Sequence, residues 1–258
     1  MKYETSVLNR FSLVAFALAS AGCGSERSSD INIAVAANAV PVVEDIGGSQ
    51  AENCGAHFVL IQGSSGALAK QALEGAPHDV FVSADVERVE KLAEAGLVAR
   101  WSVYAEGRLA IVRASHLETP METQAQVDEA LKTAKRIALP NPAHAPYGVA
   151  GKEFLKTRGF ENEFGDKLVL CESAAQARQY AATGDVDLAF VPASLVVGSP
   201  GVWLAPKDSH RPILQAVALM KRAEHNPAAE CFYEALLGPV GQEVLLRNGY
   251  GIPELPRD

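Results

Sequence analysis

The chain has 258 residues, of which 48% are hydrophobic and 21% are charged, the proportions of an ordinary globular protein. This length is near the upper bound for one hydrophobic core, so it is as compatible with two lobes as with one. The formal net charge of −8 argues against nucleic acid or an anionic membrane surface as a partner. An anionic ligand would have to be held by local donors, against the overall field of the protein.

The N-terminal residues have the pattern of an export signal. Lys2 and Arg10 precede an uncharged, mostly apolar stretch over residues 11–21. This stretch is too short to span a bilayer and has the length of the apolar part of a signal peptide. We therefore expect residues 1–22 to be removed on export.

Residues 20–23 are similar to a bacterial lipobox, which predicts that Cys23 carries a lipid. The Ser-rich residues 23–29 would then be a short tether to the membrane. Cleavage by the ordinary signal peptidase is the alternative. Either route predicts a periplasmic or cell-envelope location, with a membrane contact only through the lipid.

Three further cysteines, Cys54, Cys171 and Cys231, follow the export segment. Their spacing contains no CxxC pair and no metal-binding pattern. In an oxidising compartment an odd number leaves at least one thiol unpaired. Each of the three possible disulfides remains open.

Apolar strand-like runs alternate with helix-like segments after the tether. Strands are expected at residues 31–35, 58–61 and 79–82, with helices that start near Val40, Leu68 and Val86. We expect Asn38 to cap the first of these helices, which Gly47-Gly48 interrupts. The pair Ser64-Ser65 marks the start of the second helix.

The same alternation starts again at residue 109. Strands are expected at residues 109–112, 137–139, 168–171 and 187–191, with helices that begin at the turns around Tyr147 and Ala174. A long apolar strand at 213–220 and a helical region at 227–247, broken at Gly238-Pro239, complete the pattern.

Strands that alternate with helices indicate an α/β fold with doubly wound, Rossmann-like parallel sheets. We predict two lobes, with residues 30–108 plus 213–258 in lobe 1 and residues 109–212 in lobe 2. The strands at 109–112 and 213–220 enter and leave the second unit, so they form a two-strand hinge. In such sheets ligands lie at the carboxyl ends of strands, where helix N-termini offer unpaired N–H groups to an anion.

The chain lacks the common catalytic patterns. Residues 63–67 just miss the G-x-S-x-G nucleophile motif, because Ala67 stands where the second Gly should be. There is no H-E-x-x-H pair and no phosphate-binding glycine motif. We expect no catalytic residue and no cofactor. An exported serine hydrolase remains a distant alternative, because no activating His–Asp pair can be assigned to a serine.

Several motifs between residues 31 and 253 resemble those of the periplasmic molybdate-binding proteins that serve ABC transporters. They are Val35-Ala36-Ala37-Asn38, Gly63-Ser64-Ser65-Gly66-Ala67-Leu68, residues 75–85, residues 146–152, Leu188-Ala189-Phe190-Val191 and Gly238-Pro239. The resemblance implies a periplasmic binding protein of type II, with two α/β lobes around a hinge. It also implies a monomer without enzymatic activity that delivers molybdate or tungstate to a membrane permease.

The resemblance also assigns ligand contacts. Asn38, Ser65 with Ser64 beside it, and the helix-start amides of Tyr147 and Ala174 are expected to bind the oxyanion. Some members supply a fifth contact from a Tyr hydroxyl, but this chain has Pro192 there, which offers neither a hydroxyl nor an N–H. We expect the Asn38 side-chain amide to replace that hydroxyl.

Molybdate is a dianion that only accepts hydrogen bonds, so neutral amides and hydroxyls suit it, and such charge-assisted bonds are strong. The alternatives are other tetrahedral dianions, sulfate and phosphate, which differ mainly in size.

Overall fold

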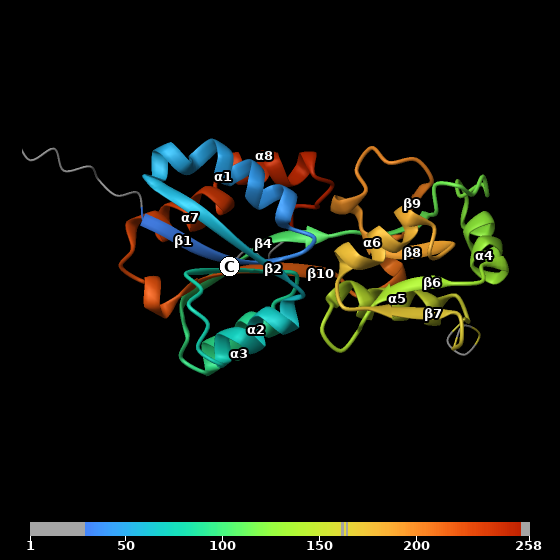
Figure 1. Ribbon diagram of the computed structural model, residues 1–258, viewed down its shortest axis with the longest axis horizontal. Helices are drawn as coiled ribbons and strands as arrows, with labels where there is room; N and C mark the ends of the chain where they lie inside the picture. The colour runs from blue at the N-terminus through green and yellow to red at the C-terminus, as the bar shows by residue number, and fades with distance from the viewer. Residues whose placement is uncertain (1–28, 161–162, 164, 254–258) are drawn as a thin grey trace, which may run out of the picture.

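The computed structural model describes residues 29–160, 163 and 165–253, which form two lobes that each contain one five-stranded sheet (Figure 1). The predicted signal peptide, Cys23 and almost all of the tether lie outside the described residues. No helix in the described ranges is long and apolar enough to cross a membrane.

Lobe 1 is built on a sheet with the strand order β2-β1-β3-β10-β4. Its strands are β1 (Ser29–Ala36), β2 (Ala56–Gly63), β3 (Val80–Ser83), β4 (Val98–Gly107) and β10 (Ile213–Met220). β1 is parallel to β2 and β3, whereas β10 is antiparallel to β3 and β4. Four of the five strands therefore run in one direction, and the prediction of a parallel sheet is wrong for β10, which returns from the other lobe in the opposite direction.

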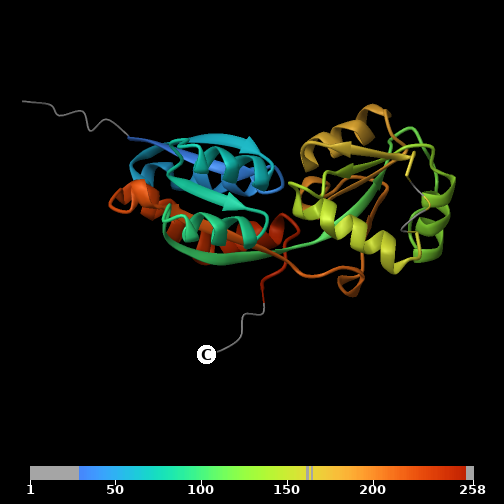
Figure 2. The same ribbon diagram turned by 90° about the horizontal axis from the view of Figure 1, so that it is seen from below.

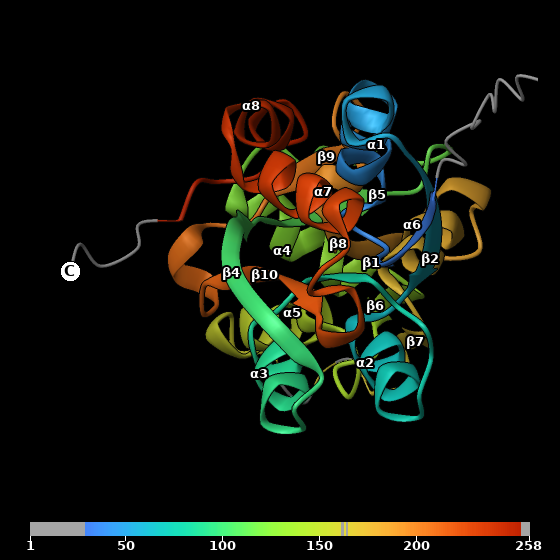
Figure 3. The same cartoon turned by 90° about the vertical axis from the view of Figure 1, so that its left-hand side faces the viewer.

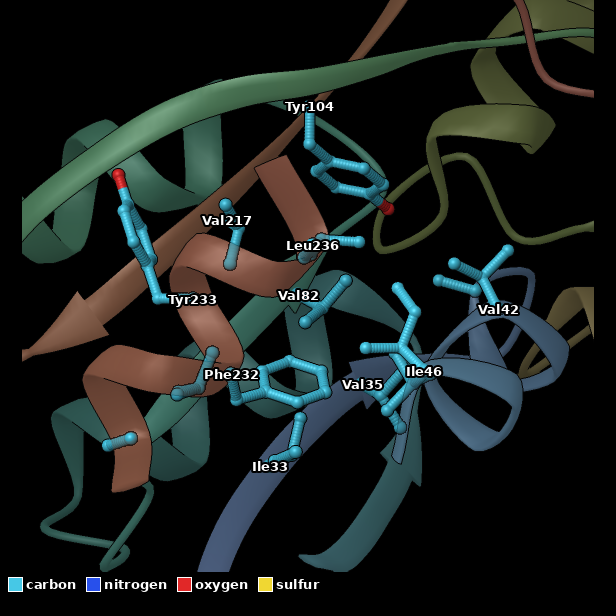
Figure 4. Close-up of a cluster of buried hydrophobic side chains, with 14 of the residues drawn as sticks. Ile33, Val35, Val42, Ile46, Val82, Tyr104, Val217, Phe232, Tyr233 and Leu236 are labelled. Atoms are coloured by element: carbon cyan, nitrogen blue, oxygen red, sulfur yellow. The ribbon is translucent and has the colours of Figure 1, made fainter. Parts of the chain in front are cut away.

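Helices cover both faces of this sheet. They are α1 (Val40–Cys54), α2 (Ser65–Leu73), α3 (Glu87–Glu94), α7 (Pro227–Leu237) and α8 (Pro239–Arg247). Figure 3 shows α1, α7 and α8 on one side of the strands and α2 and α3 on the other. On the α1 side, Ile33, Val82 and Phe232 belong to a continuous apolar core (Figure 4), and the burial of such side chains is the main stabilising term.

The helix α1 is continuous through Gly47 and Gly48, so the predicted interruption is wrong. Gly47 is buried and faces the sheet, where an added Cβ would lie 3.3 Å from the ring of Phe58. The close packing against Phe58 compensates for the low helix propensity of glycine.

Lobe 2 repeats the architecture with the strand order β7-β6-β8-β5-β9. Its strands are β5 (Leu109–Arg113), β6 (Ile137–Pro140), β7 (Leu168–Cys171), β8 (Leu188–Pro192) and β9 (Val202–Leu204). Its helices are α4 (Gln124–Thr133), α5 (Pro146–Thr157) and α6 (Ala174–Thr183). Short 3-10 turns lie at Ala193–Leu195 and Lys207–Ser209 in lobe 2, and at Lys221–Ala223 after β10 in lobe 1.

The chain passes between the two sheets twice. The first passage lies between β4 and β5, around Arg108, and the second immediately before β10, around Pro212. In Figure 2 both connections run between the lobes along the same side. This geometry allows the lobes to move relative to each other about two adjacent segments.

The structure contains one of the three disulfides that the sequence left possible. Cys54 at the end of α1 is bonded to Cys231 in α7, across 177 residues of sequence. Cys171 is a free, buried thiol, and burial raises its pKa to about 11. The Cys171 thiol therefore stays protonated and unreactive at neutral pH.

Candidate anion-binding site

A small cavity of about 20 Å³ lies between the lobes. A single water molecule needs roughly 10–15 Å³ on the same measure, so the space fits one small ion and is too small for a sugar or an amino acid. Eleven residues from both lobes line it: Ala36, Ala37, Asn38, Gly63, Ser64, Ser65, Ala84, Ala145, Pro146, Tyr147 and Ala174. The five ligand-binding residues predicted from the sequence are all among them.

Each predicted residue lies where a strand ends and a helix begins. Ser65 is the first residue of α2, Ala174 the first of α6 and Tyr147 the second of α5, while Asn38 lies between β1 and α1. The first N–H groups of a helix have no acceptor within it. In the described part of the chain, the N–H groups of these four residues have no other acceptor. Four N–H donors therefore meet at one cavity.

Ser64 and Ser65 have different structural roles. Ser64 is the N-cap of α2, and its hydroxyl oxygen accepts a hydrogen bond from the N–H of Ala67 at 3.3 Å. The side chain of Ser65 is almost fully buried, and its hydroxyl oxygen accepts one from the N–H of Ala84 at 2.9 Å. Because the Ser65 oxygen is an acceptor in that bond, its hydroxyl proton remains available to an anion in the cavity.

Asn38 is buried at the cavity, but its side chain does not act as expected. The N-cap of α1 is Ala39, which makes no side-chain capping bond, so the predicted Asn38 cap is wrong. The side-chain N–H₂ of Asn38 donates to Gln215 Oε1 at 2.8 Å and to the Tyr250 hydroxyl at 2.9 Å. Both amide protons are thereby engaged inside the protein. The backbone N–H of Asn38 is the donor that remains for the cavity.

Pro192 ends β8 in the buried part of lobe 2 and is not among the residues that line the cavity. Its neighbour Ser194 instead donates from its hydroxyl to the carbonyl oxygen of Asn38 at 2.8 Å. We expected the side-chain amide of Asn38 to replace the Tyr hydroxyl that Pro192 cannot supply. The structure does not show this replacement, because the Asn38 amide protons bond Gln215 and Tyr250 and Pro192 does not line the cavity.

The cavity contains no charged side chain, since none of its eleven lining residues is Asp, Glu, Lys, Arg or His. Within the described ranges there is also no cluster of three metal-ligating side chains. The positive potential comes from the N-terminal ends of α2, α5 and α6. This combination favours a small anion that accepts hydrogen bonds on all sides.

Hydrogen bonds join the lobes around the cavity. The N–H of Gly66 in α2 donates to the carbonyl oxygen of His144 at 3.1 Å, and Arg88 donates to that of Ala143 at 3.3 Å. The bond from Ser194 to Asn38 also crosses between the lobes. The lobes are therefore closed over the cavity.

A buried polar network, which the sequence did not predict, bonds the cavity-lining residues Asn38 and Tyr147. Gln215 in β10 is fully buried and hydrogen-bonds Asn38, Tyr104 and Tyr147, while the Tyr250 hydroxyl donates to the carbonyl oxygen of Asn38 at 2.7 Å. A glutamine inside the apolar run at 213–220 was the one available signal, because a buried amide requires partners.

The arrangement offers no nucleophile activation. In the part of the chain that the structure describes, no histidine side chain hydrogen-bonds Ser64 or Ser65. His144 accepts the N–H of Gly66 through its backbone carbonyl, and its ring is paired with Asn141 at 3.1 Å. A serine hydrolase mechanism lacks its base here.

Two hinged α/β lobes that close over a small cavity at their strand ends define a periplasmic binding protein of type II. The chain belongs to the family of bacterial extracellular solute-binding proteins, whose family model matches residues 31–251. It is a binding protein and not an enzyme.

Comparisons with individual proteins give more specific information than the family model. The chain is 34% identical to the molybdate-binding protein ModA of Rhodobacter capsulatus, over 86% of this chain and 88% of that protein. It is 30% identical to the putative ABC transporter substrate-binding lipoprotein YvgL of Bacillus subtilis, over 92% and 95%. The solved periplasmic molybdate-binding protein of Azotobacter vinelandii superposes with a TM-score of 0.79 at 28% identity, over 87% of this chain and all of that one.

Proposed function

We propose that this protein captures molybdate outside the cytoplasm and delivers it to the membrane permease of an ABC transporter. The observation that carries the proposal is the cavity of about 20 Å³ between the lobes, which is lined only by uncharged residues, among them donors from both lobes. The similarity to molybdate-binding proteins in two other bacteria supports the choice of anion.

Neutral donors explain how an acidic protein binds a dianion. Four backbone N–H groups and the Ser65 hydroxyl supply charge-assisted hydrogen bonds, each worth about 1.5–3 kcal/mol. Such fixed donors select an anion by the size at which its oxygens meet them at about 2.8–3.0 Å. Tungstate, which is nearly equal in size to molybdate, belongs to the same proposal.

Export and anchoring are part of the proposal. The disulfide between Cys54 and Cys231 supports an oxidising compartment, as expected for a protein with a signal peptide. The similarity to a lipoprotein of another bacterium supports lipidation at Cys23. We further propose that the protein acts as a monomer, with residues 30–108 plus 213–258 and residues 109–212 as its two closing lobes.

Competition titration calorimetry tests the choice of anion. Molybdate and tungstate are expected to bind almost alike, and sulfate about a hundredfold more weakly, because a smaller ion misses at least one charge-assisted bond. Phosphate is titrated in the same way as the fourth tetrahedral anion. Sulfate binding within about tenfold of molybdate would refute the molybdate assignment and favour a sulfate-binding protein.

A further inference from the structure

Gln215 lies in β10, two residues after the chain re-enters lobe 1, and its side chain is fully buried. Its Oε1 accepts hydrogen bonds from Asn38 at 2.8 Å and from the Tyr104 hydroxyl at 2.7 Å. Its Nε2 donates to the Tyr147 hydroxyl at 2.8 Å. Asn38, Tyr104 and Gln215 belong to lobe 1, whereas Tyr147 belongs to lobe 2. One amide side chain thus joins the two lobes beside the hinge.

The Tyr147 hydroxyl also fits closely against the hinge backbone. Gly107 is the last residue of β4, next to the first passage between the lobes, and a Cβ added there would lie 2.2 Å from this hydroxyl and 2.5 Å from Gln215 Nε2. No side chain at position 107 would allow this contact. Burial raises the pKa of Tyr147 and of Tyr104 well above the ordinary value, so both hydroxyls stay protonated.

We propose that Gln215 is a positioning residue that couples closure of the lobes to the arrangement of the anion donors. Through Asn38 it holds the turn after β1, and through the Tyr147 hydroxyl it holds the N-terminus of α5 at the cavity. This inference rests on the proposed function, in that it assigns the coupling to the same site.

The physical reason lies in what each hydrogen bond requires. The bond from Gln215 to Tyr104 lies within lobe 1 and does not depend on closure. The bond from Gln215 to Tyr147 exists only when lobe 2 is in place; when the lobes separate, water must replace it. Exchange of water for a protein partner contributes a modest net stabilisation, and only to the closed state.

Two substitutions separate these roles, because each removes one of the two tyrosine hydroxyls that are hydrogen-bonded to Gln215. Tyr147→Phe removes the bond between the lobes and keeps the backbone N–H that faces the cavity, so molybdate affinity is expected to fall about three- to tenfold. Tyr104→Phe is the matched control within lobe 1, and it is expected to lower the melting temperature while it changes affinity less than about twofold. Equal affinity losses in the two variants, or none in either, would overturn the proposal.

Distances between spin labels on the two lobes supply a readout that a merely structural role would not change. Cysteines in place of the exposed Lys70 of α2 and Lys152 of α5 would carry the labels, since Cys171 is buried and unreactive. Tyr147→Phe is expected to reduce the closed population, with and without molybdate, and Tyr104→Phe to leave it unchanged.

The outcomes also separate this inference from the proposed function. If the wild type binds no molybdate but Tyr147→Phe alone reduces the closed population of the ligand-free protein, the proposed function fails and the role of Gln215 stands. If the wild type binds molybdate but the three proteins have the same closed populations, the function stands and the inference is refuted.

Discussion

Ser65 illustrates how one side chain can serve both the fold and the ligand. Its oxygen accepts the N–H of Ala84 in the loop after β3, which ties α2 to the neighbouring strand, and its proton is left for the cavity. The capping of α2 falls to Ser64 instead. Substitutions at these adjacent positions should therefore affect different properties.

Ser65→Ala is expected to weaken molybdate binding by about 1.5–3 kcal/mol, which is roughly ten- to 150-fold, because it removes a hydrogen bond to a charged group. Titration calorimetry measures the affinity, and thermal melts measure the fold.

Thr123→Ala is the control for Ser65→Ala, because Thr123 caps α4 far from the cavity; it should cost about 1 kcal/mol of stability and leave affinity unchanged. Normal binding by Ser65→Ala would remove Ser65 from the site.

At the scale of elements, the N-terminus of α2 meets the loop before α5. An added Cβ on Gly66 would lie 3.0 Å from the Cα and 3.1 Å from the carbonyl oxygen of His144, which belongs to the other lobe. The glycine allows the backbone of the two lobes to approach closely enough for the Gly66 to His144 hydrogen bond. Closure therefore depends on the absence of a side chain at position 66.

Gly66→Ala is expected to weaken molybdate binding roughly five- to 150-fold, because a steric conflict of about 1–3 kcal/mol opposes the closed state alone. Gly48→Ala is the matched control: an added Cβ in this part of α1 meets no atom within 4 Å, so the change should raise the melting temperature and leave affinity unchanged. Affinity equal to wild type in Gly66→Ala, measured by the same titration, would show that the lobes close without this contact.

At the scale of the whole molecule, a buried histidine links stability to pH. His78 precedes β3 in lobe 1, and neither ring nitrogen has a hydrogen-bond partner among the described residues. Burial lowers its pKa from the ordinary 6.5; the neighbouring Asp79 opposes this shift and Arg222 adds to it. Since the unfolded chain binds a proton more readily, the stability is full above pH 6.5 and decreases as the pH falls from there towards the folded-state pKa.

His78→Leu is therefore expected to reduce the loss of unfolding free energy between pH about 7.5 and pH about 5, since a leucine has no proton to gain. Urea unfolding at both pH values measures the difference. His225→Gln, at an exposed histidine, serves as the control and should follow the wild type. The same pH dependence in His78→Leu and the wild type would exclude His78 as its source.

Local patterns were enough to predict the alternation of strands and helices and the turns that carry Ser65, Tyr147 and Ala174. Helix caps, glycines at helix C-termini and apolar runs can each be recognised within a few residues of sequence. The same rules missed β4, α4 and β9. The half-exposed strand β4 contains Arg100 and Glu106 among its apolar residues, and it becomes a strand by pairing along β10.

The sequence by itself determined which segments become helix N-termini with free N–H groups, and its resemblance to known binding proteins assigned them to one site. Only the tertiary structure decided that the Asn38 amide binds Gln215 rather than the cavity, that β10 is antiparallel, and that Cys54 pairs with Cys231. The reason is physical: the partners lie 177 residues apart in the Asn38 and Cys54 pairs, and such contacts exist only after the chain has returned from lobe 2 to complete the sheet of lobe 1.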